Sequence, residues 1–350
     1  MQIPILRIFM WVLGFSAVFG NIFVVVMRFT ERPATTVSGI KQRLFIANLG
    51  VSDCFMGMYM LIIASADLYY GDDYFTHSEE WRTGPVCKVA SFLALLSSEA
   101  SVFIITLISV DRCLSISFPF SQVQLRSYSS KVTLILLWIM AVGLALVPTL
   151  LAGPESDFYD LSDVCVGLPL ITRPTSYQIG VSNIGNELSD NTFDVPIPGD
   201  SKSAWYFSIG IFLVLNLICF VVIALCYAAI FVSVKKSAKN VQRQQNSNDE
   251  IKMATKMAAV VGTDFLCWFP VIIMGVLSQT GLVVVPLVMY VWSVVFILPI
   301  NSSLNPFLYT LASAISDYRL KKKKKSLHRA SSPEVKSISQ NKTGSTKMLE

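Results

Sequence analysis

The chain of 350 residues is 53% hydrophobic and only 15% charged, with a mean hydropathy of +0.58 and a formal net charge of +5. Soluble globular domains carry about a quarter of their residues as charges, so this composition excludes an ordinary soluble fold. The sequence contains two histidines, His77 and His328, and both lie outside the apolar blocks. That distribution argues against a metal site or a catalytic triad built on histidine.

The apolar residues fall into seven blocks, each long enough to cross a hydrocarbon core of about 30 Å as a helix. The blocks lie near residues 5–28, 44–68, 87–113, 131–151, 205–234, 254–278 and 284–311. We therefore predict an all-α membrane protein, a seven-transmembrane helix bundle, over residues 1–315. No internal repeat is visible, which disfavours transporter folds built from duplicated halves.

The charges of the connections predict the direction of the spans. Arginine and lysine gather between alternate blocks and in the tail, from Arg28 to Arg43, at Arg126 and Lys131, from Lys235 to Lys252 and from Lys321 to Lys325. By the positive-inside rule the N-terminus is extracellular and the C-terminus cytoplasmic. The opposite loops, 67–88 and 152–204, are acidic, so a basic peptide would be steered toward them.

The third block is the one around which we expect the others to pack. Its stretch from Cys87 to Arg112 is almost wholly apolar but carries Glu99 at its middle. A carboxylate facing lipid at that depth would cost about 2.5–3.5 kcal/mol. The helix is therefore expected inside the bundle, where polar neighbours can receive Glu99.

The tail and the longest loop are polar. Residues 316–330 include five consecutive lysines and predict a short amphipathic cytoplasmic helix on the membrane surface, where each cation near anionic lipid contributes about 1 kcal/mol. Residues 331–350, rich in Ser, Thr and Lys, predict a disordered cytoplasmic tail. The middle of loop 152–204, about residues 172–200, is either functional or disordered.

Short motifs stand at fixed places on the predicted helices. They are Gly20-Asn21, Leu49 to Asp53, Asp111-Arg112, Trp138, Cys267 to Pro270 and Asn305 to Tyr309, on the first, second, third, fourth, sixth and seventh spans. In this order they resemble the class A, or rhodopsin-like, G-protein-coupled receptors over about residues 5–325. Two departures are Cys113, where the class has tyrosine, and Cys219, near the level of the usual fifth-helix proline.

A narrower resemblance is to the leucine-rich-repeat-containing receptors, and among them to the relaxin-receptor-like branch. It rests on residues 98–102, 263–268 and 299–306, and most specifically on Asp264, where most of the class carries phenylalanine. The large ectodomain of that branch is absent before the first span. The sequence is therefore expected to be either a fragment or a truncated form.

Several polar residues lie at similar depth in the predicted membrane. They are Asp53, Ser101, Asn301 and Asn305, together with the acid Asp264. Lipid cannot satisfy such groups, so we expect them to gather inside the bundle as a hydrogen-bond network. Whether the network also holds a structural sodium ion, as the resemblance implies, is left open; its oxygens suit a hard cation. No other metal or cofactor is expected.

The sixth span contains a predicted hinge. Pro270 removes a backbone hydrogen bond, so part of this helix can swing about that point. Trp268 is either ordinary core packing or the trigger of the hinge. Beside Pro270 and the intramembrane acid Asp264, the trigger is the preferred interpretation.

The inner end of the third span carries Asp111 and Arg112. Arg112 is either a positive-inside anchor or, as the resemblance implies, a residue that pairs with Asp111 at rest and meets a G protein on activation. Glu250 lies eighteen positions before Trp268, which is five helical turns, and is the predicted second partner of Arg112. The alternative for Glu250 is a solvated acid near a helix start.

The resemblance also implies roles for Tyr227 and for the seventh-span motif that contains Pro306 and Tyr309. The two tyrosines are expected to move toward the third helix on activation. At the other side of the membrane, Cys87 and Cys165 are the only cysteines at the extracellular boundary. Because secretory membranes are oxidising, we expect a disulfide between them.

Together these features predict a G-protein-coupled receptor of the plasma membrane, and not an enzyme. It would transduce an extracellular, peptide-hormone signal by an outward swing of the sixth helix. Its expected partners are a heterotrimeric G protein, an extracellular peptide or protein ligand, arrestin and membrane lipids, but no nucleic acid.

The alternative function is an ion or proton pathway, or a transporter, that uses the intramembrane acids Glu99, Asp53 and Asp264. Light reception through a retinal Schiff base is excluded, because residues 284–311 contain no lysine. Ala94 stands where amine receptors carry aspartate, which disfavours an amine ligand.

Overall fold

The computed structural model describes residues 4–30, 36–118, 124–151, 164–166, 176–180, 192–196, 207, 209–238, 244–279, 296–297 and 299–308. By its internal contacts the chain divides after Pro306, and the sites described below lie in the first part. The expected surface helix 316–330, the tail 331–350 and Tyr309 lie outside the described residues.

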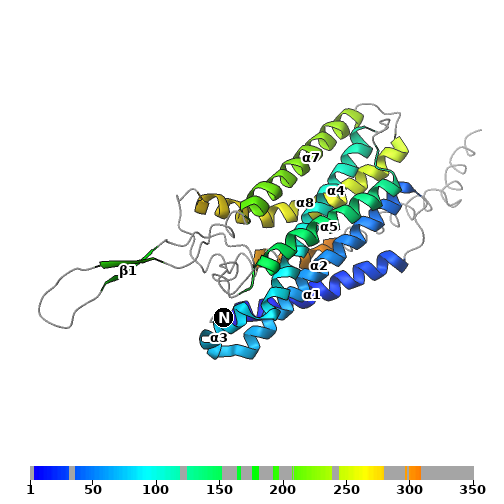
Figure 1. The fold of residues 1–350 in the computed structure, drawn as a ribbon. Coiled ribbons are helices and arrows are strands. Elements are labelled where there is room, and N and C mark those ends of the chain that lie inside the picture. The colour runs from blue at the N-terminus through cyan, green and yellow to red at the C-terminus, as the bar shows by residue number, and fades with distance from the viewer. Residues whose placement is uncertain are drawn as a thin grey trace, which may run out of the picture. The chain divides into compact units, whose positions relative to one another are not determined.

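Long helices dominate the described part of the chain (Figure 1). They are α1 (Pro4–Thr30), α2 (Val37–Tyr70), α4 (Pro85–Ser117), α5 (Ser127–Leu151), α7 (Asn216–Ala238) and α8 (Gln244–Gln279). Residues 299–308 form one further helical segment in the predicted seventh span. Five of these helices are long and apolar enough to cross a membrane, and α8 contributes a shorter apolar stretch, Ala258–Met274. The predicted all-helical membrane bundle is thus confirmed.

The helix α4 is the central one, as the sequence predicts. Within its apolar window 83% of the residues are buried by protein, against 28% for α1 and 22% for α5. It packs against α2, α5 and α7, and more lightly against α8 (Figure 1). The outer helices can leave apolar side chains exposed, because lipid covers them at no hydrophobic cost.

The prediction of a loop at residues 67–88, between α2 and α4, is wrong. A 3-10 turn, Gly71–Asp73, and the helix α3, Tyr74–Thr83, lie there instead. Gly71 has φ +51°, a left-handed conformation that ends α2 at little cost only for glycine. Pro85 then begins α4, where its missing N–H is no loss.

Two further segments depart from the simple pattern of spans. In the long loop, β1 (Ser176–Gly180) and β2 (Thr192–Pro196) pair antiparallel, with Ser176 opposite Pro196. The fifth span begins with a π-helical segment, η2 (Ile209–Leu215), before α7. The π-helical turns, which are wider than those of an α-helix, therefore form here although the chain lacks the proline that the class carries near Cys219.

Close packing of α1 on α2 depends on Gly57. A Cβ atom at that position would lie 2.7 Å from Val18 Cγ2 and 2.8 Å from the Val18 backbone nitrogen. Because the backbone of α1 cannot give way, any larger residue would separate the two helices. Small residues allow this kind of approach in membrane bundles, where packing replaces the hydrophobic effect.

Candidate functional site

Three groups of residues lie at different levels of the bundle. The disulfide end contains Tyr59, Cys87, Val164 and Cys165. The polar middle contains Asp53, Ser101, Asp264, Asn301 and Asn305. The Arg112 end contains Ser38, Lys41, Asp111, Arg112 and Leu125. The helix α4 runs from the first group to the last.

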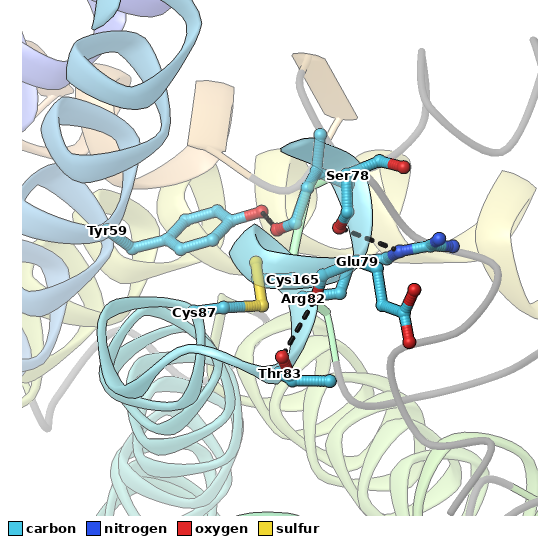
Figure 2. The surroundings of a disulfide bond; sticks show 8 residues. Tyr59, Ser78, Glu79, Arg82, Thr83, Cys87 and Cys165 are labelled. Carbon is cyan, nitrogen blue, oxygen red and sulfur yellow. Dashed lines mark hydrogen bonds between the residues drawn. A yellow bond between two sulfur atoms is a disulfide. The ribbon is translucent and has the colours of Figure 1, made fainter. Parts of the chain in front are cut away.

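At the disulfide end, Cys87 of α4 and Cys165 are bonded, with their Cα atoms 5.3 Å apart (Figure 2). The adjoining Val164 and Val166 are buried, and the hydroxyl of Tyr59 donates a hydrogen bond of 2.8 Å to the carbonyl of Val164. Residues 164–166 are therefore fixed to α4 by a covalent bond and to α2 by a hydrogen bond. Sequence reasoning paired the cysteines but missed Tyr59.

Beside this segment, α3 brings aromatic residues against the end of α2. Trp81 is only 5% exposed, and its ring meets Tyr70 edge-on with centroids 5.9 Å apart. The first turns of α1 join the same end of α2, where Arg7 Nε lies 2.7 Å from Asp67 Oδ2. That ion pair was not predicted, because a charge within the first apolar block gives no indication of its partner.

Glu99 lies in the middle of α4 and is fully buried, as predicted. Asn216 at the start of α7 donates a hydrogen bond of 3.4 Å to Glu99 Oε1. The other carboxylate oxygen has no hydrogen-bond partner among the described residues. Asn216 was missed by sequence reasoning, although an asparagine within an apolar block is itself a signal of an inward-facing polar contact.

In the polar middle, two asparagines one turn apart each hold one acid. Asn301 Nδ2 donates to Asp264 Oδ1 at 2.5 Å, and Asn305 Nδ2 donates to Asp53 Oδ2 at 2.8 Å. The four side chains are at most 4% exposed. The two carboxylates also lie within electrostatic range of each other. The structure thus brings the predicted acids and asparagines together as two linked pairs.

The polar middle presents oxygen atoms that have no hydrogen-bond partner in the described part of the chain. They are Asp53 Oδ1, Asp264 Oδ2, Ser101 Oγ, Asn301 Oδ1 and Asn305 Oδ1. Buried acceptors without donors are costly unless a cation or a water supplies the missing charge or proton. Carboxylate, hydroxyl and amide oxygens are the ligands that suit a hard cation, so these residues fit the sodium ion that the resemblance implies.

Motif residues around the polar middle join the neighbouring helices. Asn21 of α1 donates from Nδ2 to the backbone carbonyl of Ser302, at 2.9 Å. Pro306 packs so closely on Gly20 that a Cβ there would lie 2.9 Å from Pro306 Cγ. Trp138 of α5 donates to Asn48 Oδ1 of α2 at 3.0 Å.

The predicted hinge residues lie on α8. Trp268 is 4% exposed, and its ring is 6.4 Å from that of Phe220 on α7. Pro270 lies inside α8, which continues to Gln279. The buried tryptophan therefore lies one turn from Asp264 and two residues before Pro270, and the hinge itself stays a prediction.

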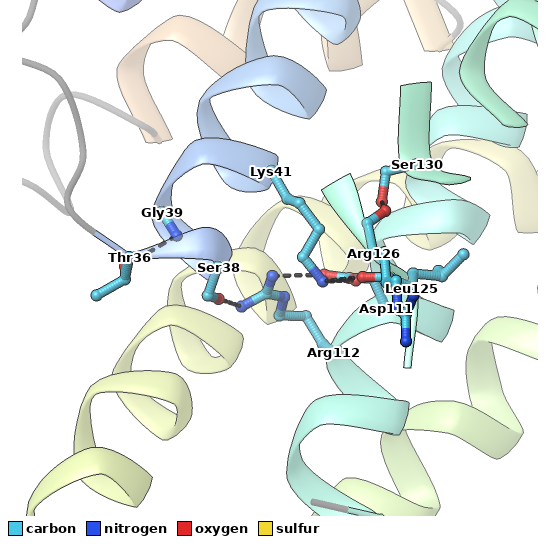
Figure 3. Close-up of polar contacts among 9 residues, drawn as sticks. All are labelled: Thr36, Ser38, Gly39, Lys41, Asp111, Arg112, Leu125, Arg126 and Ser130. Atoms are coloured by element: carbon cyan, nitrogen blue, oxygen red, sulfur yellow. Dashed lines mark hydrogen bonds and ion pairs between the residues drawn. The ribbon is translucent and has the colours of Figure 1, made fainter. Parts of the chain in front are cut away.

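At the Arg112 end, one carboxylate lies between two cations (Figure 3). Lys41 Nζ donates to Asp111 Oδ1, and Arg112 Nη2 lies 2.5 Å from Asp111 Oδ2. Arg112 Nη1 donates to Ser38 Oγ at 2.8 Å, and Lys41 Nζ also donates to the carbonyl of Leu125 at 3.0 Å. The predicted pairing of Asp111 with Arg112 is therefore present, whereas the part played by Lys41 was missed.

Two other predicted residues stand near this group. The buried hydroxyl of Tyr227 lies within electrostatic range of Arg112. The helix α8 begins at Gln244, so it extends through Glu250 as the predicted pairing needs. The side chain of Glu250, like the loop acids Asp160 and Asp163, lies outside what the structure describes, so its contact with Arg112 stays a prediction.

The geometry defines a seven-transmembrane receptor architecture, and comparison with known proteins agrees. The family model of the 7 transmembrane receptor (rhodopsin family) matches residues 20–186 and 192–309. Squid rhodopsin has the same fold, with a TM-score of 0.61 and 18% identity over all of this chain and 94% of that one. The chain belongs to the rhodopsin family of seven-transmembrane receptors.

Within that family the chain is of the relaxin-receptor-like type. It is 33% identical to dog relaxin receptor 2 over 318 residues, which are 91% of this chain and 39% of the relative. It is 34% identical to the G-protein coupled receptor GRL101 of Lymnaea stagnalis over 310 residues, 89% of this chain and 25% of the relative. The chain thus spans about a quarter to two fifths of the length of these relatives.

Proposed function

We propose that the chain is a signalling receptor that couples an extracellular peptide or protein ligand to heterotrimeric G proteins, and that it is not an enzyme. The observation that carries the proposal is the state of Arg112. Arg112 is 1% exposed as a residue, lies at the end of the central helix and is held by the acid beside it. A buried charge kept at a helix end is costly unless paired, so such residues commonly serve function.

The path between the two ends supports the same proposal. The buried segment 164–166 is bonded to α4 and α2 at the disulfide end. The polar middle then ties α8 to the last helical segment through the bond from Asn301 to Asp264. We propose that a ligand acting on the disulfide end weakens this bond. The part of α8 before Pro270 then swings outward and frees Arg112 to meet the G protein.

The orientation follows from charge. We propose a multi-pass protein of the plasma membrane with the disulfide end extracellular and the Arg112 end cytoplasmic, because Lys41 and Arg126, which belong to two of the basic connections, lie at the Arg112 end. The surface helix 316–330 would bind anionic lipid on that side, and arrestin would compete with the G protein there. A sodium ion would be held by the open oxygens of the polar middle and would supply a positive charge to balance the acids there.

The ligand is proposed to be basic where it meets the receptor. The loops 67–88 and 152–204 carry more acids than bases, and exposed Glu79 and Glu80 on α3 belong to the first of them. Such a surface steers a cationic peptide and raises its rate of association. Neutralising Asp160 and Asp163 together should lower that rate and its dependence on salt; an unchanged rate would count against a basic ligand.

The test needs no added agonist. The full chain is expressed with a panel of sensors that report each class of Gα, and basal output is measured at equal surface expression. Asp264→Ala should raise basal output, since it removes the bond to Asn301, and Arg112→Ala in the same background should abolish the increase. Ser65→Ala, at an exposed position of α2 outside these sites, serves as the control. Absence of any output from all Gα classes in both the parent chain and Asp264→Ala would overturn the proposal.

A further inference from the structure

The side chain of Lys41 does not lie where a lysine of a basic connection is expected. Lys41 is only 5% exposed and lies one turn into α2. The helix starts just before it, where Thr36 accepts a hydrogen bond of 3.2 Å from the Gly39 amide. The Lys41 ammonium group points away from solvent and toward Asp111 and Leu125 (Figure 3). Three elements therefore meet at this one cation: the start of α2, the end of α4 and the segment before α5.

The two oxygens of Asp111 are divided between two cations. Lys41 holds Oδ1 and Arg112 holds Oδ2, and all three residues are at most 5% exposed. One negative charge is thus shared by two positive charges in a buried place. An arrangement that only had to hold Arg112 at rest would need no second cation, and the second cation repels the first.

We propose that Lys41 is the resident counter-charge of Asp111, which keeps that carboxylate paired when Arg112 leaves it for a G protein. This inference rests on the proposed function. Removing one partner of a buried ion pair leaves an uncompensated charge, which is strongly unfavourable. Lys41 avoids that state, because Asp111 stays bonded through Oδ1 after Oδ2 is released.

Lys41 also has a positioning role in the same event. By donating to the Leu125 carbonyl, it fixes the segment that precedes α5 to the level of Asp111. The first turn of α5 closes independently, since Ser130 N donates to Arg126 O at 2.9 Å. Lys41 therefore keeps this segment in one place while Arg112 changes partners.

The charge role is tested by an epistasis experiment on the full chain in nanodiscs. The binding of purified, nucleotide-free G protein is measured for Lys41→Met, for Asp111→Asn and for the double variant. Lys41→Met should weaken binding about 5-fold, the lower end of typical couplings in two-state proteins. In the Asp111→Asn background, where no carboxylate needs a counter-charge, the same substitution should change binding by less than about 2-fold.

Two further variants complete that experiment. Lys41→Arg keeps the charge and should bind the G protein like the parent chain. Lys131→Met, at an exposed lysine near the start of α5, makes the same change of charge at the same end and should have no effect. An equal loss from Lys41→Met in both backgrounds would show a merely structural role and would overturn the counter-charge.

The positioning role is tested without any G protein. Hydrogen–deuterium exchange of the peptide spanning residues 124–130 should be faster in Lys41→Met and unchanged in Asp111→Asn, which retains the bond to Leu125. Unchanged exchange in Lys41→Met would overturn the positioning role. Failure of the parent chain to bind any class of G protein would instead overturn the proposed function and the counter-charge with it, while the exchange result would still decide the positioning role.

Discussion

The polar middle and the Arg112 end are both buried groups of charged and amide side chains, but they satisfy their acids differently. In the polar middle, Asp53 and Asp264 each accept one asparagine N–H, and each keeps an oxygen without a hydrogen-bond partner among the described residues. At the Arg112 end, both oxygens of Asp111 are held by cations.

This difference indicates two ways of building a switch inside a membrane bundle. A half-satisfied acid can exchange a water, a proton or a cation while the helices keep their places. A fully paired acid must break an ion pair before anything moves, and the released cation then needs a new partner if its charge is not to be left unpaired. The polar middle is therefore suited to adjusting the balance of states, and the Arg112 end to holding one state firmly.

The largest expected effect is at the Arg112 end. Asp111→Ala leaves Lys41 and Arg112 as two buried cations without their shared acid, and it should lower the free energy of unfolding by about 3–5 kcal/mol. The measurement is thermal or denaturant unfolding of the purified chain. Asp73→Ala, at an exposed acid, is the control and should stay within about 0.5 kcal/mol. Equal losses in the two variants would show that the paired carboxylate contributes no more to the free energy of unfolding than an exposed acid does.

A smaller loss is expected from the acids of the polar middle. Asp264→Ala removes one hydrogen bond and leaves the Asn301 donor unsatisfied, so the cost should be about 1–3 kcal/mol. Asp53→Ala should lower the free energy of unfolding by a similar amount, because it leaves the Asn305 donor unsatisfied. The same unfolding assay applies to both variants. A loss as large as that of Asp111→Ala would contradict the distinction between half-satisfied and fully paired acids.

The response of stability to sodium also distinguishes the two regions, because only the polar middle is expected to bind the ion. At a concentration ten times its Kd, sodium should stabilise the chain by about 1.4 kcal/mol through the polar middle. Replacing sodium by choline at constant ionic strength should remove this stabilisation. Asp53→Asn should abolish the response, whereas Asp73→Asn should retain it. A parent chain that is equally stable in both salts would exclude a functional sodium site.

The smallest effect is expected from Glu250. A partly exposed pair with Arg112 would contribute only about 0.2–1 kcal/mol, yet this bias is enough to change a small active fraction several-fold. Basal output of Glu250→Ala should therefore rise at equal surface expression, with Asp249→Ala beside it on α8 as the control. If Glu250→Ala leaves basal output unchanged, the Arg112 end is closed by Asp111 without help from α8.

Much of the fold could be predicted because lipid imposes strict local rules. A charged group that faces hydrocarbon near the middle of the membrane is costly, so the burial of Glu99 and the central place of α4 follow from the sequence of one block. The disulfide could be predicted too, since only Cys87 and Cys165 stand at the predicted extracellular boundary. The helical connection α3 was not accessible in this way, because it lies outside the apolar spans.

The sequence by itself determined which residues must turn inward, because the penalty for exposing them to lipid depends on each residue and its depth alone. Only the tertiary structure decided their partners. It paired Asn216 with Glu99 and Arg7 with Asp67. It also directed Lys41 toward Asp111, although the sequence shows Lys41 only as one of several cations in a basic connection. Partners come from helices distant along the chain, so their choice depends on the packing of the whole bundle, which no single span contains.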